Sequence, residues 1–89
     1  MEYEWDSAKA KANLRKHRVS FADASLALED PRALTIADPD TSREQRFISM
    51  GSDPLGRVLV TVFSPRGRRT RIISSRKASR AERRAYESQ

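Results

Sequence analysis

The chain has 89 residues, enough for one small domain with a modest core, and 34% of them are charged. The absence of cysteine excludes disulfides and thiolate chemistry, and with a single histidine we expect no metal site and no cofactor. The formal net charge of +6 is unevenly placed: residues 1–56 hold 8 Lys/Arg and 10 Asp/Glu, net −2, whereas residues 57–89 hold 10 and 2, net +8.

Arginine outnumbers lysine by 14 to 4. The planar guanidinium group grips phosphate or carboxylate through two parallel hydrogen bonds, so this bias favours a phosphate-bearing ligand or an acidic protein partner. A GC-rich genome would enrich arginine as well. No apolar run approaches the roughly 20 residues of a membrane span, and the acidic N-terminal stretch lacks the apolar core of a signal peptide. We therefore expect a cytoplasmic protein with no membrane contact.

The first half of the chain predicts a short strand followed by two helices. Residues Glu2–Trp5 alternate in the manner of a strand, and Asp6 is a natural N-cap for a helix over Ser7–Lys16. A second helix begins at Ser20 and ends before Pro31, because the residue preceding a proline is biased away from helical angles. Two aromatic side chains of this region are expected in the core, Trp5 and Phe21.

The second half predicts four strands separated by turns: Arg32–Ala37, Gln45–Met50, Arg57–Phe63 and Arg71–Ser75. The third strand is apolar on both faces and is therefore placed centrally. The segments Gly51–Gly56 and Ser64–Arg69 read as a loop and a turn. A last helix over Ser79–Glu87 opens with a capping box formed by Ser79 and Glu82.

This order of elements predicts a single α+β domain over residues 1–89. It comprises two N-terminal helices, a four-stranded antiparallel meander with a short additional N-terminal strand, and a C-terminal helix. The joint between the last strand and the last helix is rich in arginine and lysine. A packed apolar joint does not need that many cations, but a polyanion-binding surface does.

Three separated segments of the chain, in matching order, resemble the BrnT family of type II toxins. They are EWDSAKAKANLRKHRVSFADA, REQRFISMG and RIISSRKASRAERRAY, which together span roughly Glu4 to Tyr86. Two positions depart from the family pattern. Arg18 stands where these proteins commonly have the glycine that would relieve a left-handed residue after the helix, and Ser75 replaces the alanine of an S-A-R signature.

The resemblance implies a RelE-like fold and a ribonuclease that inhibits translation and growth by cleaving RNA. It also implies neutralisation by a BrnA-type antitoxin that carries a ribbon-helix-helix DNA-binding part. The toxin would then contact DNA only through the antitoxin complex, and a 2:2 hetero-tetramer is the assembly that the family suggests.

Metal-independent RNA cleavage can use the 2′-hydroxyl of the substrate as the nucleophile. It needs a base for the hydroxyl proton, cations for the charge that develops on the phosphate, and an acid for the leaving oxygen. We predict Arg76 and Arg71 as phosphate-binding and transition-state-stabilising groups, the alternative being a solvated strand edge or ion pairs with the acidic N-terminal half. Arg46 follows, on an inner strand, with pairing to Glu44 or Asp53 as the alternative.

The base and the acid are less well defined by the sequence. His17 is a candidate for either because histidine titrates near neutral pH, but it could instead bond the last carbonyls of the first helix. Lys9 would be a base only in a cationic, partly buried site that lowers its pKa, and a solvated helix face is its default. For Glu82 we favour the capping role over a catalytic one. Further RNA-binding candidates are Arg80, Lys77, Arg83 and Tyr86.

Several alternatives stay open at this level. The Tyr86 ring could stack on a base or pack on the sheet. The same arginines would also suit a nucleic-acid-binding module that does not cleave its ligand, or a purely protein-binding partner with a basic face.

Overall fold

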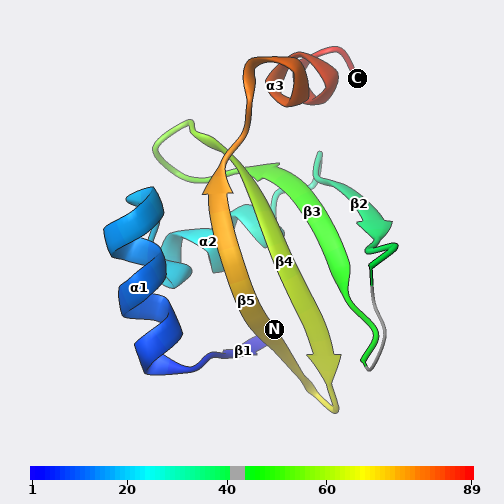
Figure 1. Ribbon diagram of the computed structural model, residues 1–89. Helices are drawn as coiled ribbons and strands as arrows, with labels where there is room; N and C mark the ends of the chain where they lie inside the picture. The colour runs from blue at the N-terminus through cyan, green and yellow to red at the C-terminus, as the bar shows by residue number, and fades with distance from the viewer. Residues whose placement is uncertain (41–43) are drawn as a thin grey trace.

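A computed structural model of the chain describes residues 1–40 and 44–89. Its elements are β1 (Glu2–Glu4), α1 (Ser7–His17), α2 (Phe21–Leu28), β2 (Leu34–Ala37), β3 (Phe47–Ser52), β4 (Val58–Arg66), β5 (Arg69–Lys77) and α3 (Arg80–Glu87). The strands form one sheet in the order β1-β5-β4-β3-β2, in which β1 is parallel to β5 and the other neighbours are antiparallel (Figure 1). The α+β class, the meander and the short N-terminal strand are thereby confirmed.

The two N-terminal helices and the sheet enclose the core. In Figure 1, α2 crosses behind the sheet, where it contacts β3, β4 and β5, and α1 lies along β5. The most buried apolar side chains lie between these helices and the sheet: Val19, Phe21, Ala24, Ala27, Leu59 and Ile72. The central position of β4 agrees with its prediction, because Leu59 packs under the helices while Val58 and Val60 are buried on the other face.

Trp5 was expected in the core, and this prediction is wrong. Its side chain is 40% exposed, whereas Phe21 is 2% exposed. The two rings meet edge to face with centroids 6.0 Å apart. Trp5 follows β1 at the margin of the sheet, so its ring covers Phe21 from outside and keeps one side in solvent.

The loop predicted over Gly51–Gly56 and the turn predicted over Ser64–Arg69 are shorter than expected. Gly51 and Ser52 belong to β3, and the turn between β4 and β5 is confined to Gly67 and Arg68. A Cβ atom on Gly51 would lie 2.4 Å from the carbonyl oxygen of Ala27, so this strand position needs glycine for close packing against α2 and not for a turn.

A side chain replaces a strand along the edge of β5. Strand β1 pairs with β5 over Arg69–Arg71 and leaves the rest of that edge without a neighbouring strand. There the Ser75 amide donates to Asn13 Oδ1 at 3.1 Å, and Asn13 Nδ2 donates to the Ser75 carbonyl at 2.8 Å. Asn13 Nδ2 also donates to the Val19 carbonyl at 3.0 Å. Asn13 therefore joins α1, the α1–α2 connection and β5 through buried hydrogen bonds.

Both departures from the family pattern have a structural account. Arg18 adopts left-handed angles, φ 60° and ψ 31°, and its amide donates to the Leu14 carbonyl at 2.9 Å, so this non-glycine residue bears the strain of ending α1. The hydroxyl of Ser75 is buried and lies 2.9 Å from the Thr61 hydroxyl, which satisfies both groups.

We expect Asn13→Ala to destabilise the fold strongly. It leaves the buried Ser75 amide and two carbonyls without partners, which should cost about 3 kcal/mol of the free energy of unfolding. Chemical denaturation would measure this change. Lys11→Ala on the exposed side of α1 is the matched control and should change stability by less than about 0.5 kcal/mol. Equal stability of the two variants would contradict the bridging role of Asn13.

Arg18→Gly should stabilise the protein, in contrast to an ordinary glycine substitution in a helix. Relief of the left-handed strain is worth up to about 1 kcal/mol after the entropy lost by glycine is included. Arg15→Gly, three residues earlier and inside α1, should instead lose about 1 kcal/mol. Thermal unfolding of both variants tests this, and a loss of stability in both would show that Arg18 carries no strain.

Candidate functional site

Many arginines of the basic C-terminal part are already paired with carboxylates. Arg71 Nε lies 3.2 Å from Glu4, and Arg69 Nε lies 3.6 Å from Glu2, so β1 neutralises part of β5. Arg57 is paired with the buried carboxylate of Asp53 at 2.7 Å and also with Asp23 at 2.9 Å. The expected alternative for Arg71, an ion pair with the acidic N-terminal half, is therefore present in the structure.

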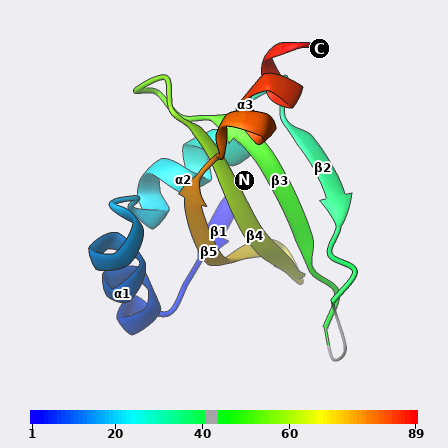
Figure 2. The same cartoon turned by 45° about the horizontal axis from the view of Figure 1, so that its top comes forward.

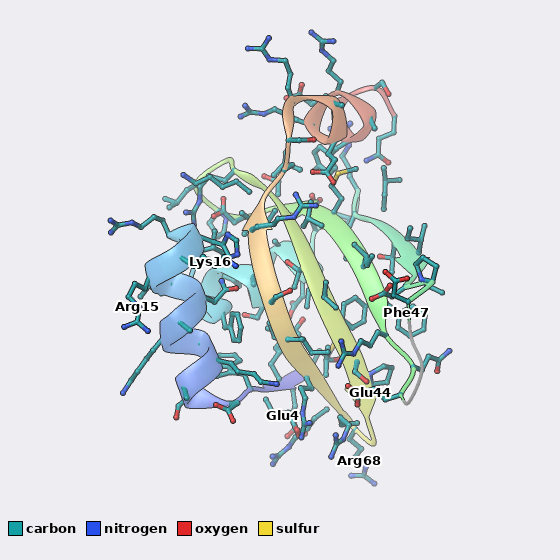
Figure 3. The ribbon with its side chains drawn as sticks, in the orientation of Figure 1. Glu4, Arg15, Lys16, Glu44, Phe47 and Arg68 are labelled. Atoms are coloured by element: carbon teal, nitrogen blue, oxygen red, sulfur yellow. The ribbon has the colours of Figure 1, made fainter. Side chains whose placement is uncertain are left out.

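The cations of α1 are different. Within residues 1–40 and 44–89, no ion pair is formed by the side chains of Lys9, Lys11, Arg15, Lys16 and Arg18. Figure 3 shows Arg15 on the side of α1 that is turned away from the sheet. These five positive charges lie on one helix and its cap, so their fields add in the region beside β5.

Two hollows of about 240 Å³ each lie along α1. The first, near β1, is lined by Glu4, Trp5, Asp6, Lys9, Arg71, Ile72 and Ile73. The second, between α1 and β5, is lined by Lys9, Ala12, Asn13, Lys16, His17, Ile73 and Ser74. Lys9 and Ile73 line both hollows. The structure thus brings Lys9 together with Arg71 at one end and with His17 at the other.

A carboxylate that the sequence interpretation missed lies in the first hollow. Glu4 lines it with Lys9, and its carboxylate accepts a hydrogen bond from Arg71 Nε at 3.2 Å. Asp6 also lines this hollow, but it caps α1 by accepting from the amides of Ala8 and Lys9 at 2.8 and 3.1 Å. The alternation of side chains in a three-residue strand could not predict the place of Glu4. Its position beside Arg71 depends on the parallel pairing of β1 with β5.

Arg76 is held by a carboxylate of its own joint. Its Nη1 and Nη2 atoms donate to Glu82 Oε1 and Oε2 at 2.8 and 3.0 Å. Glu82 also accepts from the Ser79 amide at 2.8 Å, and the Ser79 hydroxyl accepts from the Glu82 amide, which confirms the predicted capping box. The bonds from Arg76 and then from the Ser79 backbone lower the pKa of Glu82 to about 2. Glu82 is therefore committed to structure.

The remaining cations of the joint surround a separate hollow. It has a volume of about 280 Å³ and is lined by Arg57, Val58, Lys77, Ala78 and Arg83. Lys77 and Arg80 make no ion pair with any residue that the structure describes, and Arg83 has a loose contact of 3.7 Å with Glu87. This end of the sheet, beyond which α3 lies in Figure 2, therefore keeps cations available to a ligand.

Arg46 is not brought together with Arg76. It precedes β3 and does not lie on the strand as expected, and it pairs with Glu44 at 3.3 Å. The register sets the two apart, because β3 begins at Phe47 opposite Phe63, whereas Arg76 lies opposite Val60. Figure 3 shows Glu44 and Phe47 at the end of the sheet that is far from α3.

Tyr86 is buried, with 7% of its surface exposed. Its hydroxyl donates to the Asp30 carboxylate, and the Arg32 guanidinium lies over its ring at 5.6 Å from the centroid. The bond to Asp30, and then burial, raise the pKa of Tyr86. Asp30 Oδ2 also accepts from the Ser52 amide at 2.8 Å, so Tyr86 anchors α3 to the sheet. This geometry favours packing over stacking on a nucleobase.

Residues 1–40 and 44–89 contain neither a metal-binding cluster nor a membrane-spanning helix. No three His, Asp or Glu side chains come together in a way that could hold a metal ion. No helix in this part of the chain has the length and apolar character needed to cross a bilayer.

The Arg76–Glu82 pair predicts a specific pH dependence of stability. The folded-state pKa of Glu82, about 2, lies below its ordinary value of 4.5, so the ionised carboxylate stabilises the fold above pH 4.5 and this contribution is lost as the pH falls towards 2. The stability difference between wild type and Glu82→Gln should be constant at neutral pH and shrink in that range. Denaturation at a series of pH values measures it.

Glu87→Gln is the control for this prediction, because Glu87 is exposed and lies 3.7 Å from Arg83. Because its contact with Arg83 is loose and exposed, this variant should differ in stability from wild type by less than about 0.5 kcal/mol. If the Glu82→Gln and wild-type curves ran parallel down to pH 2, the fold would not lower the pKa of Glu82.

Comparison with known proteins adds to this geometry. The family described as "Ribonuclease toxin, BrnT, of type II toxin-antitoxin system" matches residues 5–82. A crystal structure of the Brucella abortus ribonuclease toxin BrnT is similar to this chain, with a TM-score of 0.67 and 28% identity over 90% of this chain and 99% of that one. A search of curated proteins gave no significant match. With most of its length matched, the chain belongs to the BrnT family of ribonuclease toxins of type II toxin–antitoxin systems.

Proposed function

We propose that this chain cleaves RNA without a metal ion, inhibits translation and growth by doing so, and uses the α1–β5 region as its site. The observation that carries the proposal is the position of Lys9, which lines both hollows and shares one with Arg71 and the other with His17. The unpaired cations of α1 surround the same region and would draw the RNA backbone to it.

The chemistry follows from these groups. A base takes the proton of the 2′-hydroxyl, whose oxygen attacks the adjacent phosphorus. The bond to the 5′-oxygen then breaks, an acid protonates that oxygen, and a 2′,3′-cyclic phosphate remains. Glu4 and Lys9 are the candidates for the base in the first hollow, and His17 in the second is the candidate for the acid. Arg71, which lies against Glu4, would stabilise the charge on the phosphate.

The β5–α3 joint would bind the RNA on either side of the scissile bond. Arg76 can serve there once phosphate takes the place of Glu82, because both are oxyanions that bind a guanidinium group in a bidentate manner. Lys77, Arg80 and Arg83 line or flank the neighbouring hollow and would contact further phosphates. The buried Tyr86 would act by holding α3, and Arg46 lies apart from both regions.

A type II toxin has an antitoxin partner, and we propose that this one is of the BrnA type with a ribbon-helix-helix DNA-binding part. The complex would be a 2:2 hetero-tetramer in the cytoplasm that reaches DNA through the antitoxin. We also propose that the fold is RelE-like. The α+β topology and the similarity to the Brucella toxin support this.

The test is cleavage of total RNA in EDTA by purified, antitoxin-free protein. Wild type should cleave, Lys9→Met should be slower by about 10²-fold or more, and Arg71→Ala or Arg76→Ala by about 10²- to 10³-fold. Arg68→Ala is the matched control. Arg68 lies at the tip of the β4–β5 turn, away from α1 in Figure 3, and its loss should leave the rate unchanged.

The variants also separate the alternatives. Loss of cleavage in Glu4→Gln but not in Lys9→Met would assign the base to Glu4. Wild-type protein that binds RNA in a salt-dependent manner but cleaves none would contradict the nuclease and favour a binding module.

A further inference from the structure

An apolar groove between α1 and the start of α2 lies outside the hollows of the proposed chemistry. It has a volume of about 220 Å³ and is lined by Trp5, Ala10, Lys11, Leu14, Ser20, Phe21 and Ala22. Two large side chains of this lining are open to solvent, Leu14 at 48% and Trp5 at 40% exposure. An exposed tryptophan and an exposed leucine on one concave surface are typical of a protein-binding site.

The margin of the groove is positively charged. Lys11 lines it and Arg15 follows one turn later on α1, and neither forms an ion pair with any of the described residues. A complementary ligand would therefore present an apolar side chain flanked by carboxylates. RNA fits less well, because its phosphates would meet a wall made largely of Ala10, Leu14 and Ala22.

The groove is continuous with the proposed site through one side chain. Trp5 lines the groove and also the hollow that holds Lys9 and Arg71. A segment that lies in the groove and extends past Trp5 would reach that hollow. Occupation of the groove can therefore block the access of RNA. Apart from Lys11, whose charge adds to the field of α1, the groove contains none of the groups proposed to act on RNA.

We propose that this groove is the docking site of the antitoxin. An acidic amphipathic segment places an apolar side chain against Leu14 and Trp5 and its carboxylates beside Lys11 and Arg15. This inference rests on the proposed function, in that the partner is the cognate antitoxin, and it adds the surface that the antitoxin uses and the character of the segment that binds there.

The experiment measures the binding of the antitoxin encoded with this toxin to purified full-length variants by calorimetry. Leu14→Glu places a carboxylate in the groove and should weaken binding by about 10²-fold or more. Leu26→Glu is the matched control, because Leu26 is a helical leucine that is 50% exposed and does not line the groove, and it should bind as wild type does. Far-UV circular dichroism and thermal unfolding verify that both variants are folded.

A second variant tests the same groove without changing its apolar side chains, so a folding defect is not expected. Lys11→Glu changes a solvent-exposed charge, and it should weaken the complex mainly through slower association that depends on salt. RNA cleavage by Leu14→Glu should equal that of wild type but persist at antitoxin concentrations that stop the wild-type enzyme.

The outcomes are distinct. If wild type does not bind the antitoxin, the proposed partner is wrong and this inference with it. If wild type binds and Leu14→Glu binds equally well, the groove is not the docking site and the inference alone is overturned. Loss of binding in Ile36→Glu instead would place the antitoxin on the edge strand β2, where Ile36 is 63% exposed. Loss of RNA cleavage with intact antitoxin binding in Leu14→Glu would assign the groove to RNA.

Discussion

Two hydrogen bonds between the Asn13 side chain and the Ser75 backbone hold α1 against β5, and the proposed site lies between these two elements. Strand β1 is too short to cover the edge of β5, and a free edge would leave polar backbone groups unsatisfied beneath α1. The carboxamide offers Ser75 an N–H donor and a carbonyl acceptor as a neighbouring strand would, and its second N–H is free to bond the Val19 carbonyl, so it can complete the sheet where no strand is present. Because Asn13 lies between Lys9 and His17 on α1, the same bonds set the distance of both from β5.

Ion pairs formed in the folded chain determine where free positive charge lies on the surface, more than the number of basic residues in each half of the sequence does. The sequence has its positive excess in residues 57–89, yet Arg57, Arg69, Arg71 and Arg76 all meet carboxylates in the folded chain. Among the described residues, Lys77 and Arg80 stay unpaired at the β5–α3 joint, but five unpaired cations lie on α1 and its cap, in the half of the chain that is formally acidic. The acidic residues of that half neutralise the strands and leave the helix basic, which moves the centre of the proposed RNA site from the joint towards α1.

Local chemistry accounts for what could be predicted of the fold and the site. The caps at Asp6, Ser20 and Ser79, the proline after α2 and the alternating strands depend on near neighbours, and they located every helix and strand to within a few residues. The site residues stay predictions, and only part of their arrangement in space could be foreseen. The groups on α1 and β5 lie beside each other, but the isolation of Arg46, the burial of Tyr86 and the place of Glu4 come from contacts between distant segments.

The sequence alone determined the α+β class, the order of the elements, the capping role of Glu82 and the family, because each depends on short-range pattern or on motifs read in order. The tertiary structure decided which cations are free, that Asn13 completes the sheet, that Lys9 lies between Arg71 and His17, and that Trp5 is exposed beside an apolar groove. These properties arise from strand register and helix packing, which join residues as far apart as Asn13 and Ser75. The local sequence pattern does not indicate which residues that are far apart in the chain will meet in the fold.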